Sequence, residues 1–343
     1  MIEPKRILVA KLRALGDIMT ALPLLRALKE RFPAAGITLV VDDLYQDLVS
    51  VNPRVDELWL HPAGDLRGRG AWFALKQQAD MIRRIRQARF ELFIDLYGTT
   101  RTAAWGVLGG IPHRLGFALR GRKYFYTQAV VAKHRYVVDL NLQFAELLGW
   151  QGQDRSLEFF LAPDDEAAAR QQLARQGWTP GRPLLAVSPG GGWPLKQWGA
   201  AKFGRVARSL AESTGCQVVL TGSAAETALL EECASQLREP ALILAGLPLR
   251  QAAAVIREAR LFLGNDSGPK YFAEAFGVPT LICYGPTDSV NNNPSTPRTL
   301  VATCIQPCQP CHSETCRAGR RACLDDLSED EVLKLAQSLW RRE

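Results

Sequence analysis

The stretch Leu263-Gly-Asn-Asp-Ser-Gly-Pro-Lys-Tyr-Phe-Ala-Glu-Ala-Phe-Gly-Val-Pro279 reads as the end of a buried strand, a polar turn, a helix and the start of another strand. Residues 265–268 are turn formers, and Pro269 suits the first position of a helix, where no backbone N–H is needed. A helix that begins here points free N–H groups at whatever lies above the strand end. The turn is therefore either an anion-binding site or an ordinary capped turn of an α/β fold.

The same strand–turn–helix pattern recurs along the chain. Apolar runs typical of buried parallel strands occur at 6–11, 37–41, 55–60, 90–96, 184–188, 217–221, 242–245, 261–264 and 280–284. Because helical patterns lie between them, the sequence predicts parallel sheets with crossover connections. The pattern breaks around 151–163, so we expect an N-terminal domain over 1–160 and a C-terminal domain over 161–325. Residues 326–343 form a final helix, which we expect to pack toward the first domain.

Composition and charge narrow the class of protein. Of the 343 residues, 47% are hydrophobic and 22% are charged, which is typical of a globular protein. No apolar run reaches the roughly 18 residues that span a bilayer, and no basic and apolar leader opens the chain, so we expect a cytoplasmic location. Residues 1–160 hold 23 Lys and Arg against 16 Asp and Glu, and within 67–135 the numbers are 14 and 3. That local excess favours an anionic partner over a merely solvated basic face.

Polar turns follow several of the predicted strands. Asp17 lies on the loop after the first strand, where ligands bind in open α/β sheets. The helix that follows carries apolar residues at helical spacing, and with Thr20 as N-cap its Pro23 falls in the first turn.

Three glycine-containing turns fall in the second half. The turn Ser188-Pro-Gly-Gly-Gly-Trp-Pro-Leu-Lys196 follows a strand directly, and its glycines would let backbone approach a ligand while Lys196 reaches a phosphate. Together with Thr221-Gly-Ser-Ala-Ala-Glu226 and the turn at 265–268, it favours a nucleotide diphosphate. Neither half has the Gly-x-Gly-x-x-Gly fingerprint of a dinucleotide site, which argues against a nicotinamide oxidoreductase.

Four motifs in this order resemble glycosyltransferase family 9, whose best-known members are the ADP-heptose:lipopolysaccharide heptosyltransferases. They are Ile7 to Pro23, Ser188 to Trp198, Thr221 to Glu226, and Asn265-Asp-Ser-Gly-Pro with Gly277-Val-Pro and Tyr284-Gly-Pro-Thr-Asp288. The resemblance covers most of the chain. It implies a GT-B fold, with two Rossmann-like parallel-sheet domains facing across a cleft, and inverting, metal-independent transfer of a sugar from a nucleotide diphosphate.

The resemblance also implies roles for individual residues. Asp17 matches the general base, and the remaining matches lie on the donor side: Ser188, Lys196, Glu226, Asp266, Ser267 and Gly268. Inverting displacement needs a carboxylate that takes the hydroxyl proton and positive charge that stabilises the departing diphosphate, so these residue types agree with the chemistry. Alternatively, Asp17 has a purely structural role and caps the helix that follows.

The implied partners are an ADP-heptose donor, an anionic lipopolysaccharide-core or related glycolipid acceptor, and the anionic inner face of the membrane, which fits a peripheral basic surface. Arg101 and Arg114 are the acceptor candidates, because both are expected in turns that follow predicted strands. The chain departs from the family at Lys270-Tyr271, where Met-His is common, and in the Ser-Val-Asn-Asn-Asn that follows Asp288. Both departures lie near the expected donor site.

Two features leave alternatives open. Five cysteines, Cys304, Cys308, Cys311, Cys316 and Cys323, form one late cluster, which can bind a structural zinc, form disulfides or stay as free thiols. No step of the transfer needs them, and we expect no cofactor for catalysis. The alternative functions are a GT-B sugar-nucleotide epimerase and, less well supported, a basic nucleic-acid-binding protein with a zinc knuckle. We expect no nucleic-acid partner, because such a protein would leave the three glycine turns unused.

Overall fold

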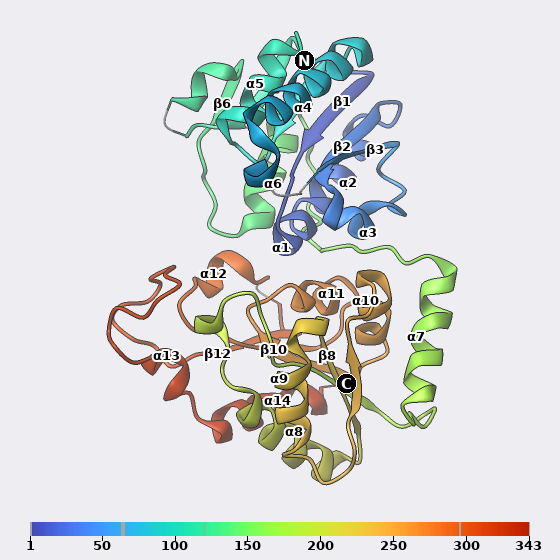
Figure 1. The fold of residues 1–343 in the computed structure, drawn as a ribbon, viewed down its shortest axis with the longest axis vertical. Coiled ribbons are helices and arrows are strands. Elements are labelled where there is room, and N and C mark those ends of the chain that lie inside the picture. The colour runs from blue at the N-terminus through green and yellow to red at the C-terminus, as the bar shows by residue number, and fades with distance from the viewer. Residues whose placement is uncertain (1, 63–65, 120, 295, 343) are drawn as a thin grey trace. The chain divides into compact units, whose positions relative to one another are not determined.

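A computed structural model describes residues 2–62, 66–119, 121–294 and 296–342. The chain divides into two compact units, Met1–Phe160 (unit 1) and Leu161–Glu343 (unit 2). In each unit, strands form a sheet with helices on both sides (Figure 1). Among the described residues, no helix has both the length and the apolar character needed to cross a membrane.

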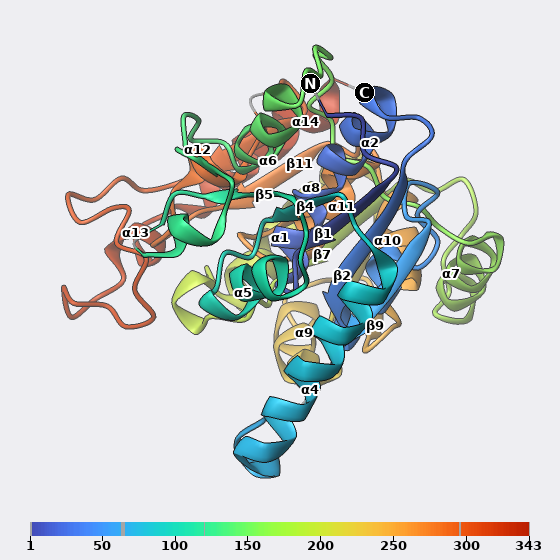
Figure 2. The same ribbon diagram turned by 90° about the horizontal axis from the view of Figure 1, so that it is seen from above.

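Unit 1 holds a six-stranded sheet in the order β3-β2-β1-β4-β5-β6, in which every described pair is parallel. Its strands are β1 (Arg6–Ala10), β2 (Gly36–Asp42), β3 (Glu57–His61), β4 (Leu92–Asp95), β5 (His113–Phe117) and β6 (Gln128–Val130). Its helices are α1 (Leu15–Met19), α2 (Leu22–Arg31), α3 (Gln46–Val49), α4 (Leu66–Ala88), α5 (Thr100–Leu108) and α6 (Val137–Leu147), with 3-10 turns at Asp43–Tyr45 and Arg122–Phe125. Figure 2 shows the first part of α4 extending beyond the sheet.

Unit 2 holds the second six-stranded parallel sheet, in the order β12-β11-β10-β7-β8-β9. Its strands are β7 (Leu184–Ser188), β8 (Gln217–Gly222), β9 (Leu242–Ala245), β10 (Leu261–Asn265), β11 (Thr280–Cys283) and β12 (Thr299–Ala302). Its helices are α7 (Pro163–Arg175), α8 (Ala200–Thr214), α9 (Thr227–Ala234), α10 (Leu249–Arg257), α11 (Pro269–Ala275), α12 (Ser289–Asn292), α13 (Ala322–Asp325) and α14 (Glu329–Arg341), with 3-10 turns at Pro194–Lys196 and Ala224–Glu226.

Both sheets share one topology. Numbered from the start of each unit, the strands of both sheets run 3-2-1-4-5-6 across the sheet. The order reverses between β1 and β4 in unit 1 and between β7 and β10 in unit 2, and loops after neighbouring strands diverge at such a point. The carboxyl ends of these two strand pairs are therefore where each unit can hold a ligand.

The last helix, α14, packs within unit 2. Its buried face, which includes Val332, Ala336 and Leu339, belongs to the same apolar core as β7 and α8, and it contacts α8 and the strands β10 to β12. Ser328 caps its first turn by accepting a hydrogen bond from the Glu331 N–H at 3.1 Å. The sequence favoured packing toward the first domain, whereas the contacts that bury this face lie in unit 2.

Three local features differ from the sequence predictions. The single helix predicted after the first strand is two helices, and Ala21, not Thr20, is the N-cap before Pro23. The strands β5 (His113–Phe117) and β6 (Gln128–Val130) lie where no strand was predicted. The short strand β12 was not predicted either. The strands β6 and β12 lie at sheet edges, where strands are short and partly polar, and β5 begins with the polar residues His113 and Arg114, so the hydrophobic pattern of all three is weak.

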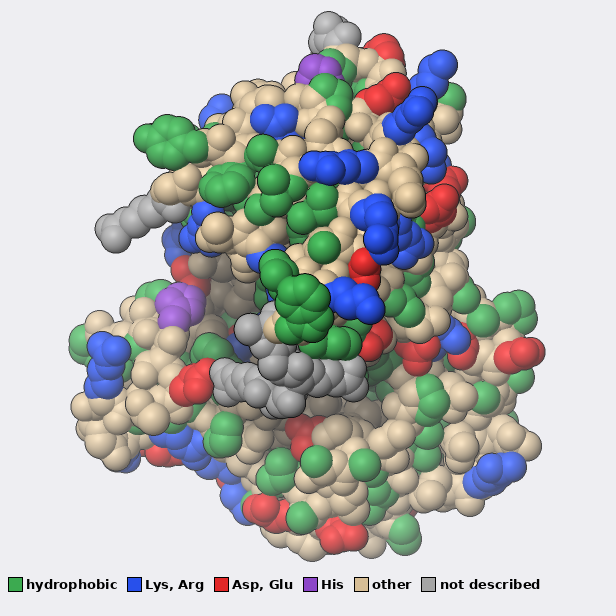
Figure 3. Space-filling view, turned by 45° about the horizontal axis from the view of Figure 1, so that its top comes forward, with side chains coloured by type: hydrophobic (Ala, Val, Ile, Leu, Met, Phe, Trp, Pro, Cys, Tyr) green, Lys and Arg blue, Asp and Glu red, His purple; other side chains and the backbone are tan. Residues whose placement is uncertain are grey.

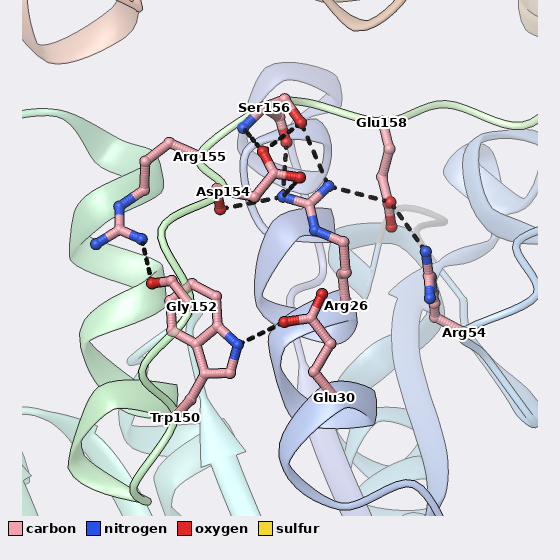
Figure 4. A network of polar contacts seen from close by, with 9 residues as sticks. All are labelled: Arg26, Glu30, Arg54, Trp150, Gly152, Asp154, Arg155, Ser156 and Glu158. Atoms are coloured by element: carbon pink, nitrogen blue, oxygen red, sulfur yellow. Dashed lines mark hydrogen bonds and ion pairs between the residues drawn. The ribbon is translucent and has the colours of Figure 1, made fainter.

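The segment that leads out of unit 1 is fastened to α2 (Figure 4). The guanidinium of Arg26 is buried, and it donates hydrogen bonds to the backbone carbonyls of Asp154 and Ser156, both at 3.2 Å, and contacts the Glu158 carboxylate at 3.3 Å. The Trp150 ring N–H donates to Glu30 at 2.6 Å. Residues 150–158 therefore belong structurally to unit 1.

Candidate functional site

The expected donor side is built at the carboxyl ends of β7 and β10. Lys196 lies in the 3-10 turn after the glycine-rich loop, and its ammonium donates to Asp266 Oδ2 at 2.8 Å. Asp266 directly follows β10, and its side chain is 5% exposed, against 20% for Lys196. Two residues 70 positions apart are thus joined by a charged hydrogen bond at the point where the strand order reverses.

Asp266 has further partners from the loop after β11. The hydroxyl of Tyr284 donates to Oδ1 at 2.9 Å, and the hydroxyl of Thr287 donates to Oδ2 at 2.7 Å. Burial acts to raise the pKa of Asp266, but the charges of Lys196 and Lys270 and the hydrogen bonds outweigh it, so the pKa lies below its ordinary value. Asp266 is therefore a carboxylate at neutral pH and holds Lys196 in place.

Glu226 joins the second polar turn to the glycine-rich loop. Its Oε2 accepts hydrogen bonds from the Ser223 N–H and hydroxyl, at 2.7 and 2.8 Å, and its Oε1 accepts one from the Gly191 N–H at 2.7 Å. A Cβ atom at Gly190 would lie 2.1 Å from Oε1, so only glycine allows this approach. The carboxylate both caps the turn and fixes the loop.

Asn265 has a role that sequence reasoning missed, although it stands in the quoted turn. It is fully buried, its side-chain amide donates to the carbonyls of Pro189 and Gly190, at 2.7 and 3.1 Å, and its Oδ1 accepts from the Trp198 N–H at 3.0 Å. The sequence did hold a signal for this role. A buried amide at the end of an apolar strand needs hydrogen-bond partners, and a neighbouring loop can supply them.

The other predicted donor residues lie at the same edge. Ser188 is the buried last residue of β7 and pairs in register with Gly264 of β10. Gly268 is the N-cap of α11, and the Ser267 hydroxyl is buried without a hydrogen-bond partner among the described residues. The structure thus brings together all six residues predicted for the donor side.

Asp17 lies in unit 1, in the first turn of α1. Its carboxylate accepts a hydrogen bond from the Ala14 N–H at 3.2 Å and lies 3.8 Å from the ammonium of Lys11. The Asp17 side chain is 53% exposed and that of Lys11 is 13% exposed. Asp17 is therefore both a helix cap and an accessible carboxylate beside a cation at the carboxyl end of β1.

Lys11 and Asp95 were not predicted as site residues. Lys11 directly follows β1, and Asp95 is the last residue of β4, the neighbouring strand. Burial lowers the pKa of Lys11, while the charges of Asp17 and Asp95 oppose that shift. Burial raises the pKa of Asp95, although it accepts hydrogen bonds from the Gly98 N–H at 2.8 Å and the Tyr126 hydroxyl at 2.9 Å. A charged residue that ends an apolar strand was the signal for both.

The two acceptor candidates differ in their surroundings. Arg101 lies in the first turn of α5 and is partly exposed. Arg114 lies in β5, and its guanidinium donates to the carbonyls of Ile111 and Phe125, at 2.6 and 2.8 Å. The Arg114 side chain thus holds two backbone carbonyls in place, whereas the partly exposed side chain of Arg101 is accessible to a ligand. On the face shown in Figure 3, Lys and Arg side chains lie in several separate groups.

The two departures from the family pattern contact each other. Lys270 is fully buried, and its ammonium lies 3.0 Å from Asn293 Oδ1 and 3.4 Å from the Glu274 carboxylate. It also donates to the Asn292 carbonyl at 2.5 Å. Lys270 and the asparagine run after Asp288 are therefore in direct contact, and the charge of Lys270 helps to lower the pKa of Asp266.

The cysteine segment lies between β12 and α14, and all eight cysteines of the chain are free thiols. Burial raises the pKa of Cys323, and the charges of Cys308, Cys311 and Cys316 raise it further, which reflects their proximity. Within the described residues, no three His, Cys, Asp or Glu side chains are arranged so that they could hold a metal ion. Whether the cluster binds zinc thus stays a prediction.

A family model described as glycosyltransferase family 9 (heptosyltransferase) matches residues 79–321, which include the glycine-rich loop, Glu226, the Lys196–Asp266 pair and part of the cysteine segment. This match spans well over half of the chain. The chain belongs to glycosyltransferase family 9. It is therefore a glycosyltransferase, and the epimerase and nucleic-acid alternatives give way to this conclusion.

Curated and solved relatives agree with the family. Over 325 residues, covering 91% of this chain and 87% of the relative, the chain is 26% identical to lipopolysaccharide heptosyltransferase 1 of Pseudomonas aeruginosa. A glycosyltransferase family 9 structure from Veillonella parvula matches with a TM-score of 0.85 at 23% identity, covering 99% of this chain and 98% of that chain. The E. coli ADP-heptose lps heptosyltransferase II matches with a TM-score of 0.80 at 22% identity, covering 98% and 99%.

These likenesses, with the two six-stranded parallel sheets, show the GT-B fold of two Rossmann-like domains. The fold class implied by the sequence resemblance is confirmed.

Proposed function

We propose that this family 9 member transfers a heptose from ADP-heptose to an anionic lipopolysaccharide-core or related glycolipid acceptor, with inversion and without a metal in the transfer step. The observation that carries the proposal is the ion pair between the partly exposed Lys196 and the buried Asp266 at the reversal point of the unit 2 sheet. The relatives support the sugar, since the P. aeruginosa protein is a lipopolysaccharide heptosyltransferase and the E. coli protein is an ADP-heptose lps heptosyltransferase.

On the donor side, Lys196 supplies the positive charge for the diphosphate. Asp266 fixes its ammonium, so the cation is oriented before the donor binds, which is how electrostatic stabilisation of a leaving group works best. The Ser267 hydroxyl and Gly268 lie beside it for the phosphates, and Asp266 also borders the sugar. Ser188 opens the glycine-rich loop, and Glu226, which fixes that loop, is the proposed partner of the ribose.

On the acceptor side, Asp17 is the proposed general base. Its exposed carboxylate can reach an acceptor hydroxyl and take its proton, and the ammonium of Lys11 lies 3.8 Å from that carboxylate. Inversion follows if the hydroxyl that Asp17 deprotonates attacks the anomeric carbon opposite the departing ADP. The proton passes to Asp17 and the electron pair of the broken bond stays on the diphosphate, where Lys196 stabilises it.

The acceptor and the membrane are proposed to meet the basic part of unit 1. Arg101 is the proposed contact for an acceptor phosphate or carboxylate. Trp72 and Leu75 of α4 are 78% and 62% exposed, and an exposed aromatic among basic residues is typical of a surface that rests on an anionic membrane. A peripheral, cytoplasmic location follows from this proposal. Co-sedimentation with anionic vesicles should fall when both residues are replaced by serine.

The donor is tested by comparing nucleotide sugars. Thermal unfolding should shift upward with ADP-heptose and ADP and much less with GDP- or UDP-sugars, and the shift should be smaller in Lys196→Met. Product analysis by mass spectrometry should then show transfer of a heptose to a lipopolysaccharide-core acceptor without added metal and in the presence of a chelator. Stabilisation by a UDP- or GDP-sugar alone would overturn the ADP-heptose proposal.

A further inference from the structure

The cysteine segment divides into four thiols at one cavity and a fifth that lies apart. A cavity of about 540 Å³ is lined by Cys308, Cys311, Cys316 and Cys323. Cys304 is not part of that lining; it packs against the apolar core of unit 2 and its sulfur accepts a hydrogen bond from Gln306 at 3.4 Å.

We propose that Cys308, Cys311, Cys316 and Cys323 bind one divalent metal ion, with zinc the expected ion, and that Cys304 is not a ligand. Four thiolates in a tetrahedron, two of them from a Cys-x-x-Cys, are the ligand set that structural zinc prefers. Each thiol releases its proton on binding, so four thiolates and one divalent ion carry a net charge of −2. Three arginines also line the cavity, Arg317, Arg320 and Arg321, and the last two are ion-paired with Asp326 and Asp325. Cationic side chains beside thiols favour the thiolate form that binds a metal.

Binding has to draw the segment together, because the thiols line the cavity without converging on one point. Cys308 and Cys311 are exposed, so their side chains can turn inward without breaking a core. Cys316 gives up one contact, the bond from its thiol to the Arg320 carbonyl at 3.1 Å. Cys323 is already buried at the start of α13. The three movable ligands would therefore close onto a fixed fourth.

The same segment braces both loops that hold the Lys196–Asp266 pair. Arg321 donates to the carbonyls of Pro194 and Gln197, at 3.1 and 3.0 Å, on either side of Lys196. The backbone N–H groups of Cys311 and His312 donate to the Pro286 carbonyl, both at 3.0 Å, next to the loop residue Thr287 that bonds Asp266. A metal that closes the segment therefore also steadies the donor side, and this consequence alone rests on the proposed function.

The direct test is the metal content of the full-length protein, purified under reducing conditions and measured by elemental mass spectrometry. We expect about one zinc, or another divalent ion that prefers thiolates, per chain. Cys308→Ser and Cys311→Ser should each lose most of it, whereas the matched variant Cys304→Ser should keep it. The variants at Cys308 and Cys311 decide between binding and no binding, because both residues are exposed and serine there leaves the apolar core intact. Cobalt added to metal-free protein should produce a thiolate charge-transfer band that is absent in Cys311→Ser.

Removal of the metal with a chelator should lower the Tm and raise the donor KM several-fold, and zinc alone should restore both. Protein without bound metal whose thiols are all reactive, or whose cysteines are paired as disulfides by mass spectrometry, would overturn the proposal. Metal loss in Cys304→Ser with retention in Cys311→Ser would overturn the choice of ligands. Failure of metal-loaded protein to bind any ADP-sugar would instead count against the proposed function, so the two failures are distinguishable.

Discussion

Asp266 in unit 2 accepts hydrogen bonds from Lys196, Tyr284 and Thr287 and is almost fully buried, whereas Asp17 in unit 1 accepts one backbone hydrogen bond and is half exposed. The same fold and the same reversal point in the sheet thus hold one carboxylate rigidly and leave the other accessible. A group that positions a cation gains from rigidity, while a base must meet a proton on an incoming molecule. If the proposed function holds, the donor side of unit 2 is organised before the donor binds, whereas Asp17 gains its remaining partner only when the acceptor arrives.

The largest expected effect is at Asp17. Asp17→Asn should lower kcat by at least about 100-fold, because the amide cannot take the hydroxyl proton. Steady-state kinetics with saturating donor measure this, and the thermal shift caused by ADP should stay at its wild-type size. Asp43→Asn, an exposed residue of the same unit, is the control. A fall of less than about threefold would mean that Asp17 is only the cap of α1.

The next effect is at Lys196. Lys196→Met should lower kcat/KM for the donor by roughly 10- to 100-fold, since a charged hydrogen bond contributes about 1.5–3 kcal/mol. It should also lower the Tm, because Asp266 then lies buried without its cation. Lys334→Met removes a charge from an exposed position on α14 and should change neither value. An unchanged donor kcat/KM in Lys196→Met would mean that the rigidly held Lys196 does not act on the donor.

A smaller effect separates the two acceptor arginines. Arg101→Ala should raise the acceptor KM by about three- to tenfold, as expected for one exposed charged contact, with little change in Tm. Arg114→Ala should lower the Tm, because it leaves the carbonyls of Ile111 and Phe125 without their donor, and it should leave the acceptor KM unchanged. The opposite pattern would assign the acceptor to Arg114.

The smallest effect is the pH dependence of stability at Asp266. The folded-state pKa lies below the ordinary 3.8, so the stability that the carboxylate contributes is present above that value and is lost as the pH falls through the lowered pKa. Urea unfolding of wild type and Asp266→Asn should show a constant difference in the free energy of unfolding from pH 7 to pH 5. The difference should shrink below about pH 4. A difference that grew toward low pH would contradict the ion pair.

Most of the sheet strands could be predicted from the sequence, and so could the position of the six proposed donor-side residues at one sheet edge, because apolar runs followed by polar turns mark the carboxyl ends of parallel strands. The partners of those residues could not. Nothing in the order of residues shows that Asn265 bonds the carbonyls of Pro189 and Gly190, or that Glu226 reaches Gly191, since these contacts depend on which strands are neighbours.

The same limit applies elsewhere. Lys11 and Asp95 lie more than 80 residues apart, and only the pairing of β1 with β4 brings them together. Lys270 and Asn293 stand in two separate departures from the family pattern, and only the structure shows that their side chains are hydrogen-bonded to each other. Sequence reasoning identified side chains with the right chemistry, while the topology determined which of them interact.

The fastening of residues 150–158 to α2 has a practical consequence for exchanging halves between relatives. Since Arg26 holds the backbone at Asp154 and Ser156, this extended piece travels with the N-terminal half although its sequence resembles a connector. Only residues 159–162 separate the fastened segment from α7, which begins at Pro163, and they span about 14 Å at most. A chimera joined at these residues keeps each half whole. A crossover near residue 152 would instead leave the buried guanidinium of Arg26 without the native segment that carries its hydrogen-bond acceptors.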